Sequence, residues 1–318
     1  MKVLITGITG QDGSLMAKEL LEKNYQVIGC ARNINDKSIN NLKLLDINNK
    51  IDFEIGDLLD NKFIATLFRK HNFNEIYHFA AQSSVGLSQI EPYDTIKFNT
   101  LSTLNLLDSI KKYSNKTKLL NACSSEVFGT NNNNPLNELS NFSPISPYGL
   151  SKEFGYSTVK LYRETYDLFA CNAILFNHES EFRGDNFFIK KLVKESVALQ
   201  KGYQENIYLG NLNVKRDIGY APDYMHALYL MLKSEIPKDY VIASGISTEL
   251  SEIVRYVFLK LNISLNKIKI KEDLIRQNEI YDSVGNSNQI KLDLGWNYSK
   301  NIYEILDLLI EQELKNNN

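Results

Sequence analysis

The residue types best suited to chemistry lie in two neighbouring runs of the chain. Ser124 and Glu126 follow an apolar run that begins at Leu119, and Tyr148 and Lys152 stand four residues apart just after a proline. An ammonium group close to a tyrosine favours the phenolate, so this pair is a candidate base for a hydroxyl group. Glu126 adds a carboxylate that could take or return a second proton.

The spacing of Tyr148 and Lys152 decides nothing by itself, because positions 93 and 97 and positions 156 and 160 repeat it. The setting of Tyr148 is what distinguishes it. Ser146 and Pro147 are typical of a helix start, which places Tyr148 and Lys152 one turn apart on one helix face. The upstream run has strand character and would deliver Ser124 and Glu126 at its end.

A glycine trio follows a short apolar strand at residues 2–6. Gly7, Gly10 and Gly13 stand just before a helical pattern of apolar residues. In a strand, turn and helix unit, such glycines form the tight turn, admit a diphosphate to the backbone and allow close packing, while the helix N-terminus offers N–H groups. The trio predicts dinucleotide binding, with a plain glycine turn as the alternative.

The strand at residues 26–30 ends near Arg32, where an NAD-preferring site usually places an acidic residue. An arginine there could pair with a 2′-phosphate and stack on adenine, which favours NADP; a solvated loop arginine is the alternative. Strands at 51–55 and 75–79 end in small or polar residues at the same sheet edge. Asp57 could hold the adenine amino group or cap the next helix. Ala80 and Ala81 would admit the cofactor closely.

The composition is that of an ordinary globular protein. The chain has 318 residues, 43% of them hydrophobic and 23% charged, with a net charge of -2. This balance gives no field for nucleic acid or an anionic membrane. The first residues lack the basic and apolar regions of a signal peptide, so we expect neither secretion nor membrane insertion. The three cysteines lack C-x-x-C spacing and no histidines show zinc-ligand spacing. We expect reduced core thiols, no metal, a cytoplasmic location, and neither nucleic acid nor membrane as a partner.

Two long helical patterns, at residues 93–113 and 148–169, carry continuous apolar stripes. The stripes could pair with their copies in a second subunit, which suggests a homodimer. Burial in the core of a single chain would explain them equally well.

Several runs match one pattern in the same order along nearly the whole chain. They are the glycine loop at 5–14, the segment 80–83, the segment 173–180 with Arg183 and Gly184, and segments at 209–212, 215–219, 223–224, 276–279 and 294–296. This order resembles the extended short-chain dehydrogenase/reductases and, within them, the GDP-mannose 4,6-dehydratase group. The segment 173–180 is typical of GDP-sugar dehydratases rather than of epimerases or reductases.

The resemblance implies an α/β fold, a modified Rossmann domain whose doubly wound parallel sheet is joined to a smaller α/β substrate domain. Residues 1–175 and 217–245 would form the NADP-binding domain, and residues 176–216 and 246–318 the nucleotide-sugar-binding domain. A strand at 239–244 would return to the main sheet.

The resemblance also implies a reaction, the 4,6-dehydration of a GDP-manno-configured sugar with tightly held NADP. Tyr148 would take the proton of the C4 hydroxyl while hydride leaves C4, and Lys152 would lower the tyrosine pKa and hold the nicotinamide ribose. Ser124 would bind the C4 oxygen. Glu126 would remove the C5 proton and return it to the C6 oxygen as water leaves. The hydride would then reach C6, giving a 4-keto-6-deoxy sugar.

Further roles come from the resemblance position by position. It gives the cofactor-binding residues as Gly7, Gly10, Gln11, Asp12, Gly13, Arg32, Asp57, Leu58, Ala80, Ala81, Tyr148, Lys152, His178 and Arg183. It gives the substrate-binding residues as Ser83, Asn177, Lys191, Arg216, Arg276 and Glu279. Cations such as Lys191 and Arg216 suit a diphosphate. Without the resemblance, Lys191 reads as a solvated helix lysine, and His178 remains open to a structural role in a turn.

The chain departs from the group at three places. Only Arg32-Asn-Ile-Asn35 stands where the group has a longer Arg-Arg-Ser-Ser loop that reaches a neighbouring subunit in tetramers, so a homodimer is expected and a tetramer is the alternative. Ser84 stands where histidine is common, and Glu181-Phe182 replaces a usual Pro-Arg. The smaller Ser84 would leave room for a longer sugar, so GDP-manno-heptose is a candidate beside GDP-mannose.

Two other functions remain open at this stage. A nucleotide-sugar 4-epimerase or 4-ketoreductase would use the same Ser124, Tyr148 and Lys152 but needs no base for C5, so Glu126 separates these enzymes from a dehydratase. An NADP-binding redox sensor would be expected to carry a broken catalytic set, whereas all four residues are present here.

Overall fold

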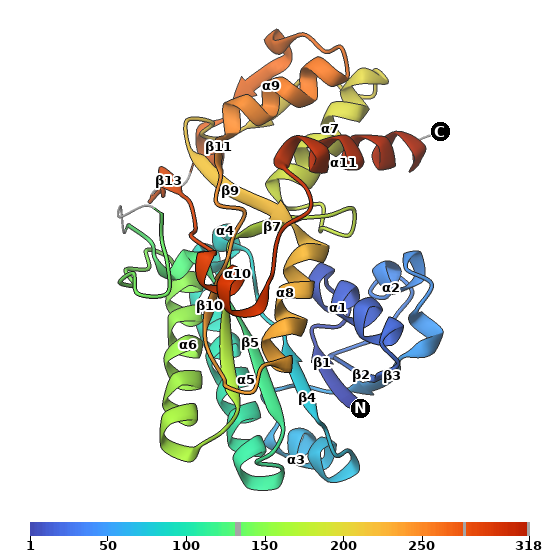
Figure 1. Cartoon of the computed structure of the whole chain (residues 1–318). Coiled ribbons are helices and arrows are strands. Elements are labelled where there is room, and N and C mark those ends of the chain that lie inside the picture. Colours follow the sequence, from blue (N-terminus) through green and yellow to red (C-terminus); the bar gives the residue numbers. More distant parts are fainter. Residues whose placement is uncertain (131–134, 276–277, 317–318) are drawn as a thin grey trace.

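The computed structural model describes residues 1–130, 135–275 and 278–316, and its larger part is built on a seven-stranded sheet (Figure 1). The strand order is β10-β6-β5-β4-β1-β2-β3, and all neighbours pair in parallel. Their bounds are β1 Lys2–Thr6, β2 Gln26–Ala31, β3 Asp52–Ile55, β4 Glu75–His78, β5 Lys118–Ser124, β6 Ala170–Leu175 and β10 Tyr240–Ile242. The order turns back between β1 and β4, the place where doubly wound sheets bind ligands. The predicted Rossmann fold is confirmed.

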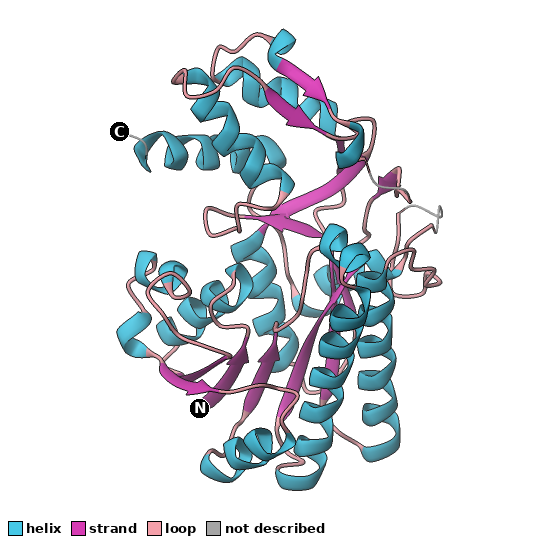
Figure 2. Ribbon diagram, turned by 180° about the vertical axis from the view of Figure 1, so that it is seen from behind, coloured by secondary structure: helices cyan, strands magenta, loops and turns pink. Residues whose placement is uncertain are grey.

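Helices cover both faces of this sheet because its strands are apolar on both sides. Val3 and Ile5 pack with α1 and α8, whereas Leu4 between them packs with α3, α5 and α6. Figure 2 shows long helices along one face, seen from behind. The bounds are α1 Gln11–Glu22, α2 Asn40–Leu44, α3 Asn61–Lys70, α4 Val85–Ile90, α5 Pro92–Tyr113, α6 Pro147–Tyr166 and α8 Ala221–Lys233. The three cysteines are buried and free, as reduced thiols would be.

A smaller part lies beyond the carboxyl ends of these strands. In it β9 (Lys215–Tyr220) pairs with β7 (Asn177–Glu179), β11 (Ser247–Glu249) and β13 (Asp282–Ser283), and β8 (Ile207–Leu209) pairs with β12 (Ile268–Ile270). Helices α7 (Phe188–Gln200), α9 (Leu250–Lys260) and α11 (Ile302–Asn316) share a separate apolar core with them. This part therefore has its own interior.

The chain passes several times between the two parts. The predicted strand at 239–244 is present as β10, which pairs with β6. The sequence places all of 246–318 in the smaller part, yet α10 (Asn288–Leu294) and Trp296 join the core around α8. The Trp296 indole finds both an apolar site and an acceptor there, since Nε1 donates to the Asp223 carbonyl at 2.8 Å.

Asp217 fastens this crossover. Its buried carboxylate accepts hydrogen bonds from Ser244 N and Gly245 N, each at 2.9 Å, and from Gly285 N at 3.2 Å. Burial raises the pKa of Asp217, and the hydrogen bonds oppose that rise. One carboxylate thus holds three chain segments at the junction of the two parts.

Candidate active site

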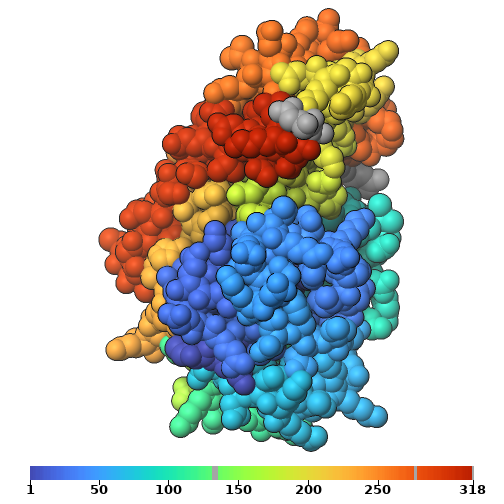
Figure 3. All heavy atoms as spheres, turned by 90° about the vertical axis from the view of Figure 1, so that its right-hand side faces the viewer, coloured from blue at the N-terminus to red at the C-terminus, as the bar shows by residue number. Residues whose placement is uncertain are grey.

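A large cavity lies where the two parts meet. Its volume is about 1330 Å³, and its walls come from the glycine loop, the carboxyl ends of β2, β4 and β5, and segments of the smaller part around β7 and α7. Figure 3 shows the blue N-terminal residues directly below the yellow-green and red segments of the smaller part. The position is the sheet edge at which the sequence predicts ligand binding.

The glycine loop is shaped for a close approach of a ligand to its backbone. Gly7 has φ 69°, and a Cβ there would lie 2.8 Å from Ala80 N. A Cβ on Gly13 would lie 2.3 Å from the Gly7 carbonyl oxygen, so α1 could not pack on the loop with a larger residue. The N-cap of α1 is Gly10, which leaves the helix start without a side-chain cap. Free N–H groups at such an end fit the diphosphate of a dinucleotide.

Ser124, Glu126 and Tyr148 open into this same cavity. Helix α6 begins at Pro147, and the Ser146 hydroxyl caps it by accepting from Gly149 N at 3.0 Å. A Cβ on Gly149 would lie 2.7 Å from the Glu126 carbonyl oxygen. The glycine therefore lets the helix start pack directly on the short 3₁₀ turn Ser125–Val127, which carries Glu126.

The protonation of Tyr148 differs from what its spacing to Lys152 suggests. Burial raises the pKa of Tyr148 well above its ordinary value, a hydrogen bond with Ser124 opposes the rise, and the charge of Glu126 adds to it. Lys152 Nζ lies 5.8 Å from the centroid of the Tyr148 ring and donates to the Ala122 carbonyl at 2.7 Å. Burial also lowers the pKa of Lys152. In this arrangement the pKa of Tyr148 is raised rather than lowered, because the effect of burial outweighs that of the hydrogen bond with Ser124.

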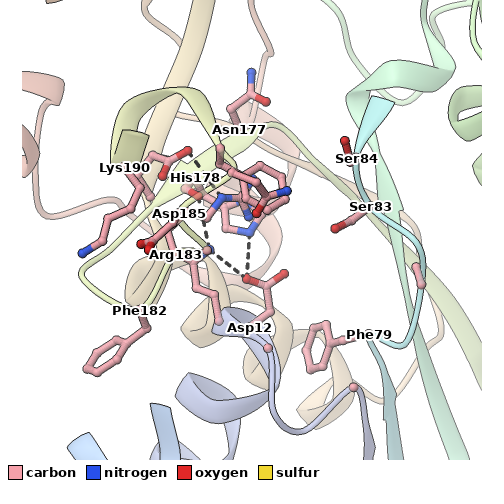
Figure 4. A pocket seen from close by; sticks show the side chains of 18 of the residues that line it. Asp12, Phe79, Ser83, Ser84, Asn177, His178, Phe182, Arg183, Asp185 and Lys190 are labelled. Atoms are coloured by element: carbon pink, nitrogen blue, oxygen red, sulfur yellow. Dashed lines mark hydrogen bonds and ion pairs between the residues drawn. The ribbon is translucent and has the colours of Figure 1, made fainter. Parts of the chain in front are cut away.

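A chain of charged side chains joins the two parts across the cavity (Figure 4). His178 Nε2 lies 3.1 Å from Asp12 Oδ1, and its Nδ1 lies 2.7 Å from the Phe176 carbonyl. Arg183 Nε lies 3.6 Å from Glu179 Oε1. Burial alone would raise the pKa of Asp12, but the charges of His178 and Arg183 hold that pKa far below its usual range. Burial raises the pKa of Glu179, and Arg183 offsets part of that rise.

On the substrate side, Asn177, Arg216 and Glu279 line the cavity as predicted. Arg216 Nη2 donates to Glu279 Oε1 at 2.8 Å, and Nη1 donates to the Ile280 carbonyl at 2.6 Å. Arg276 lies outside the described residues. Arg216 and Glu279 are therefore already positioned by each other.

Lys190 and Lys194 of α7 line the cavity, whereas Lys191 does not. Lys191 Nζ lies 3.7 Å from Glu195, one turn along the helix, and is partly exposed. The buried Lys190 donates to the Glu181 carbonyl at 3.2 Å and lies 3.9 Å from Glu313. The apolar stripe of α7 could have found it, because position 190 shares a helix face with the buried positions 193 and 197.

Asp57 is also placed differently from either expectation. Its neighbours Gly56 and Leu58 line the cavity, but Asp57 does not. Its carboxylate accepts from Leu59 N at 2.9 Å. The cap of α3 is Asp60, which accepts from Lys62 N at 2.8 Å, so the alternative that Asp57 caps this helix is wrong.

The cavity brings most of the predicted residues together. Those that line it are Gly7, Gly10, Gln11, Asp12, Gly13, Arg32, Leu58, Ala80, Ala81, Ser83, Ser124, Glu126, Tyr148, Lys152, Asn177, His178, Arg183, Arg216 and Glu279. Sequence reasoning missed Lys37, Phe98, Lys190 and Glu313, which also line it. Lys37 and Phe98 belong to no motif, and nothing in their spacing marks them.

Two further observations concern the described ranges as a whole. No helix in them is long and apolar enough to cross a membrane. No three His, Cys, Asp or Glu side chains in them gather as a metal-binding group.

Solved structures of one class superpose on almost the whole chain. A UDP-glucose 4-epimerase from Thermotoga maritima has a TM-score of 0.89 at 23% identity and covers 100% of both chains. A dTDP-glucose 4,6-dehydratase from Streptomyces venezuelae has a TM-score of 0.88 at 21% identity, covering 99% of this chain and 98% of its own. The chain therefore has the fold of these two nucleotide-sugar enzymes.

Sequence comparison narrows the class to one family. Residues 4–309 match the profile of the family described as GDP-mannose 4,6 dehydratase. A relative of that name from Dictyostelium discoideum is 34% identical over 98% of this chain and 95% of its own length. The human relative of the same name is 39% identical over 81% of this chain and 72% of its own. The chain belongs to the GDP-mannose 4,6-dehydratase family.

Proposed function

We propose that this protein is an NADP-dependent 4,6-dehydratase of a GDP-manno-configured sugar. The observation that carries the proposal is that Glu126, Ser124 and Tyr148 open into the same cavity as the glycine loop. Membership of the family and the printed names of the relatives supply the sugar nucleotide. A bound nicotinamide would accept a hydride from the sugar and give it back.

The proposal assigns the first proton transfer to Tyr148. The tyrosine takes the proton of the C4 hydroxyl, and Ser124, already hydrogen-bonded to it, binds the C4 oxygen. Burial alone would keep Tyr148 a neutral phenol, so the positive charge of Lys152 must bring the phenolate within reach. Lys152 would also hold the nicotinamide ribose, either while it keeps its hydrogen bond to the Ala122 carbonyl or after it gives that bond up.

The proposal assigns the second proton transfer to Glu126. A ketone at C4 acidifies the C5 proton, which a carboxylate on the same cavity wall can remove. The same carboxyl group can then protonate the C6 oxygen as water leaves, so one residue acts first as base and then as acid. Epimerisation and ketone reduction at C4 need no such group, and Glu126 therefore supports dehydration over both.

The test is incubation of the protein with GDP-mannose and NADP⁺ in deuterated water. We expect a product that has lost one water, carries a 4-ketone and holds one deuterium at C5. A product of unchanged mass with inverted C4 would instead establish an epimerase. Reduction of an added 4-keto sugar by NADPH, without any water loss, would establish a ketoreductase.

The preference for NADP rests on the charge near the cofactor ribose. Arg32 lines the cavity at the end of β2, where a carboxylate would be needed to hold the ribose hydroxyls of NAD. We also propose that the cofactor stays bound between turnovers, since the hydride returns to the sugar. Protein purified without added cofactor should then release NADP on denaturation.

A small side chain in the pocket wall supports a longer substrate as a second candidate. Ser83 and Ser84 form one wall of the pocket, opposite Lys190 (Figure 4). The Ser84 hydroxyl is engaged in capping α4, where it accepts from Leu87 N at 3.2 Å, so a small side chain stands at this wall. GDP-manno-heptose would then react beside GDP-mannose. A side-by-side turnover assay in which only the hexose reacts would exclude the heptose.

A homodimer built on α5 and α6 is also part of the proposal. These helices pack together and expose Leu101, Leu150, Phe154 and Leu161. An exposed apolar face of this kind is typical of an interface. Sedimentation should give a dimer, and Phe154→Glu with Leu161→Glu should give a monomer. A tetramer, or a dimer that survives both changes, would contradict this arrangement.

A further inference from the structure

The end of the cavity near β2 and β3 is lined in part by the connection between β2 and α2. Cys30, Arg32, Gly56 and Leu58 form its floor, and Lys37 reaches it from the segment before α2. That segment is held by a local turn. Ser38 N donates to Asn35 Oδ1 and Asn35 N donates to Ser38 Oγ, both at 2.9 Å. Lys37 stands within this turn, so its backbone is fixed beside the cavity.

The cations of the cavity fall into two groups by their partners. Arg183, Lys190, Lys194 and Arg216 each have a carboxylate within 4 Å, and Lys152 donates to a backbone carbonyl. Among the residues that the structure describes, Arg32 and Lys37 have no ion-pair partner, although both line the cavity. Two cations left without a carboxylate at one end of a cavity favour an anionic ligand group there.

Arg32 is only partly available to such an anion. Its guanidinium lies over the Phe98 ring, 5.4 Å from the ring centroid. This contact orients the flat guanidinium group and leaves its other face open to adenine. A lysine on a flexible stem can place a point charge where the oriented arginine does not reach.

We propose that Lys37 is a specificity-determining residue that binds the 2′-phosphate of the cofactor adenosine, while Arg32 orients the adenine. The inference rests on the proposed use of NADP and names a residue five positions after Arg32, in the same connection between β2 and α2. Its consequence is that discrimination between NADP and NAD depends on Lys37 more than on Arg32. Loss of Lys37 removes a phosphate contact and leaves the rest of the dinucleotide site intact.

The test is calorimetric titration of the whole protein, freed of bound nucleotide, with NADP⁺, NAD⁺ and adenosine 2′,5′-bisphosphate. Lys37→Met should weaken NADP⁺ and the bisphosphate by about tenfold or more, as expected for the loss of one charge-assisted hydrogen bond, and leave NAD⁺ unchanged. Arg32→Met should weaken NADP⁺ and NAD⁺ together. The matched control is Lys43→Met, since Lys43 pairs with Asp36 at 2.7 Å and does not line the cavity.

The outcomes separate this inference from the proposed reaction. Equal weakening of NADP⁺ and NAD⁺ in Lys37→Met, or no change in either, overturns the role of Lys37. A wild-type protein that binds NAD⁺ more tightly overturns both that role and the NADP preference. If Lys37→Met selectively loses NADP⁺ binding but the wild-type protein does not dehydrate any GDP-sugar, the role of Lys37 is upheld and only the proposed reaction is overturned.

Discussion

The two ends of the large sheet carry buried charged networks of different completeness. At the amino end, the buried Glu75 of β4 contacts Lys233 and accepts a hydrogen bond from Tyr77 Oη at 3.2 Å. Lys233 also contacts Tyr25. Lys118 Nζ lies nearby and donates to two backbone carbonyls, at 2.8 and 3.0 Å. These amino-end groups find their partners within the chain.

At the carboxyl end, the network around the cavity is left incomplete. Glu179 Oε2, Glu181 Oε2 and Arg183 Nε are buried without a hydrogen-bond partner among the described residues. Glu179 and Arg183 form an ion pair at 3.6 Å, but these atoms lack hydrogen bonds. An unsatisfied buried polar group costs about 1–3 kcal/mol, so the cluster is unfavourable for folding alone. We infer that the amino-end network serves stability and that a ligand completes the carboxyl-end network.

Substitution of either proposed proton-transfer residue at the carboxyl end should have the largest effect on activity and leave the fold unchanged. Glu126→Gln keeps the shape of the side chain but cannot take a proton, and Tyr148→Phe removes the phenol. Each should lower kcat by about 10²–10⁴-fold, the usual contribution of a general acid or base. Dehydration is measured with GDP-mannose as the substrate. Binding of NADP⁺ is measured by calorimetry and should be nearly unchanged. The control is Glu164→Gln, at an exposed position of α6. Full activity in both active-site variants would refute the assigned roles.

A second change tests how the ammonium of Lys152 acts on Tyr148. Burial raises the tyrosine pKa, and a positive charge nearby favours the phenolate, so Lys152→Met should raise that pKa further. The rate at pH 8 should fall about 10²-fold and then increase with pH, because more of the phenolate forms. The measurement is kcat from pH 6 to 10. The control is Lys160→Met, at an exposed position of the same helix, which should keep the wild-type pH profile. A wild-type profile in Lys152→Met would show that the Lys152 ammonium does not act on Tyr148.

A third change addresses the amino-end network. Glu75→Gln leaves Lys233 without its carboxylate, and breaking a buried pair in this way is strongly destabilising. Because Lys233 is partly exposed, we expect about 2–3 kcal/mol less unfolding free energy in urea, with kcat unchanged. Asp36→Asn, in a surface pair with Lys43, should leave stability unchanged. A loss of activity without a loss of stability would place Glu75 in the site instead.

The same contrast explains what could be predicted from sequence. The strand, turn and helix at residues 2–22 follows from local pattern, since Gly7 and Gly13 have no room for a side chain. The start of α6 follows from Ser146 and Pro147 in the same way. The engagement of Lys152 by the Ala122 carbonyl does not, because it depends on where a strand distant in sequence places its backbone. The pairing of Glu75 with Lys233 spans 158 positions and carries no local signal.

The choice between adjacent lysines shows a site residue that pattern could have found. The sequence-based choice of Lys191 followed family order, whereas the helical period of α7 turns Lys190 inward. Periodicity fixes which face is buried, but only the structure shows that the buried face here borders a cavity rather than the core.

Substitution of Lys190 or Lys191 should have a smaller effect than any change above. Lys190 faces the cavity next to Glu181 and Glu313, so Lys190→Met should remove a positive charge that a sugar diphosphate can use. We expect KM for GDP-mannose to rise about tenfold with kcat nearly unchanged, the signature of lost uniform binding. Lys191→Met removes the same charge one position along and should leave KM unaltered, because its ammonium faces Glu195. If Lys191→Met gave the larger rise, the diphosphate would bind on the outer side of α7, and the incomplete network of the cavity would need another ligand to complete it.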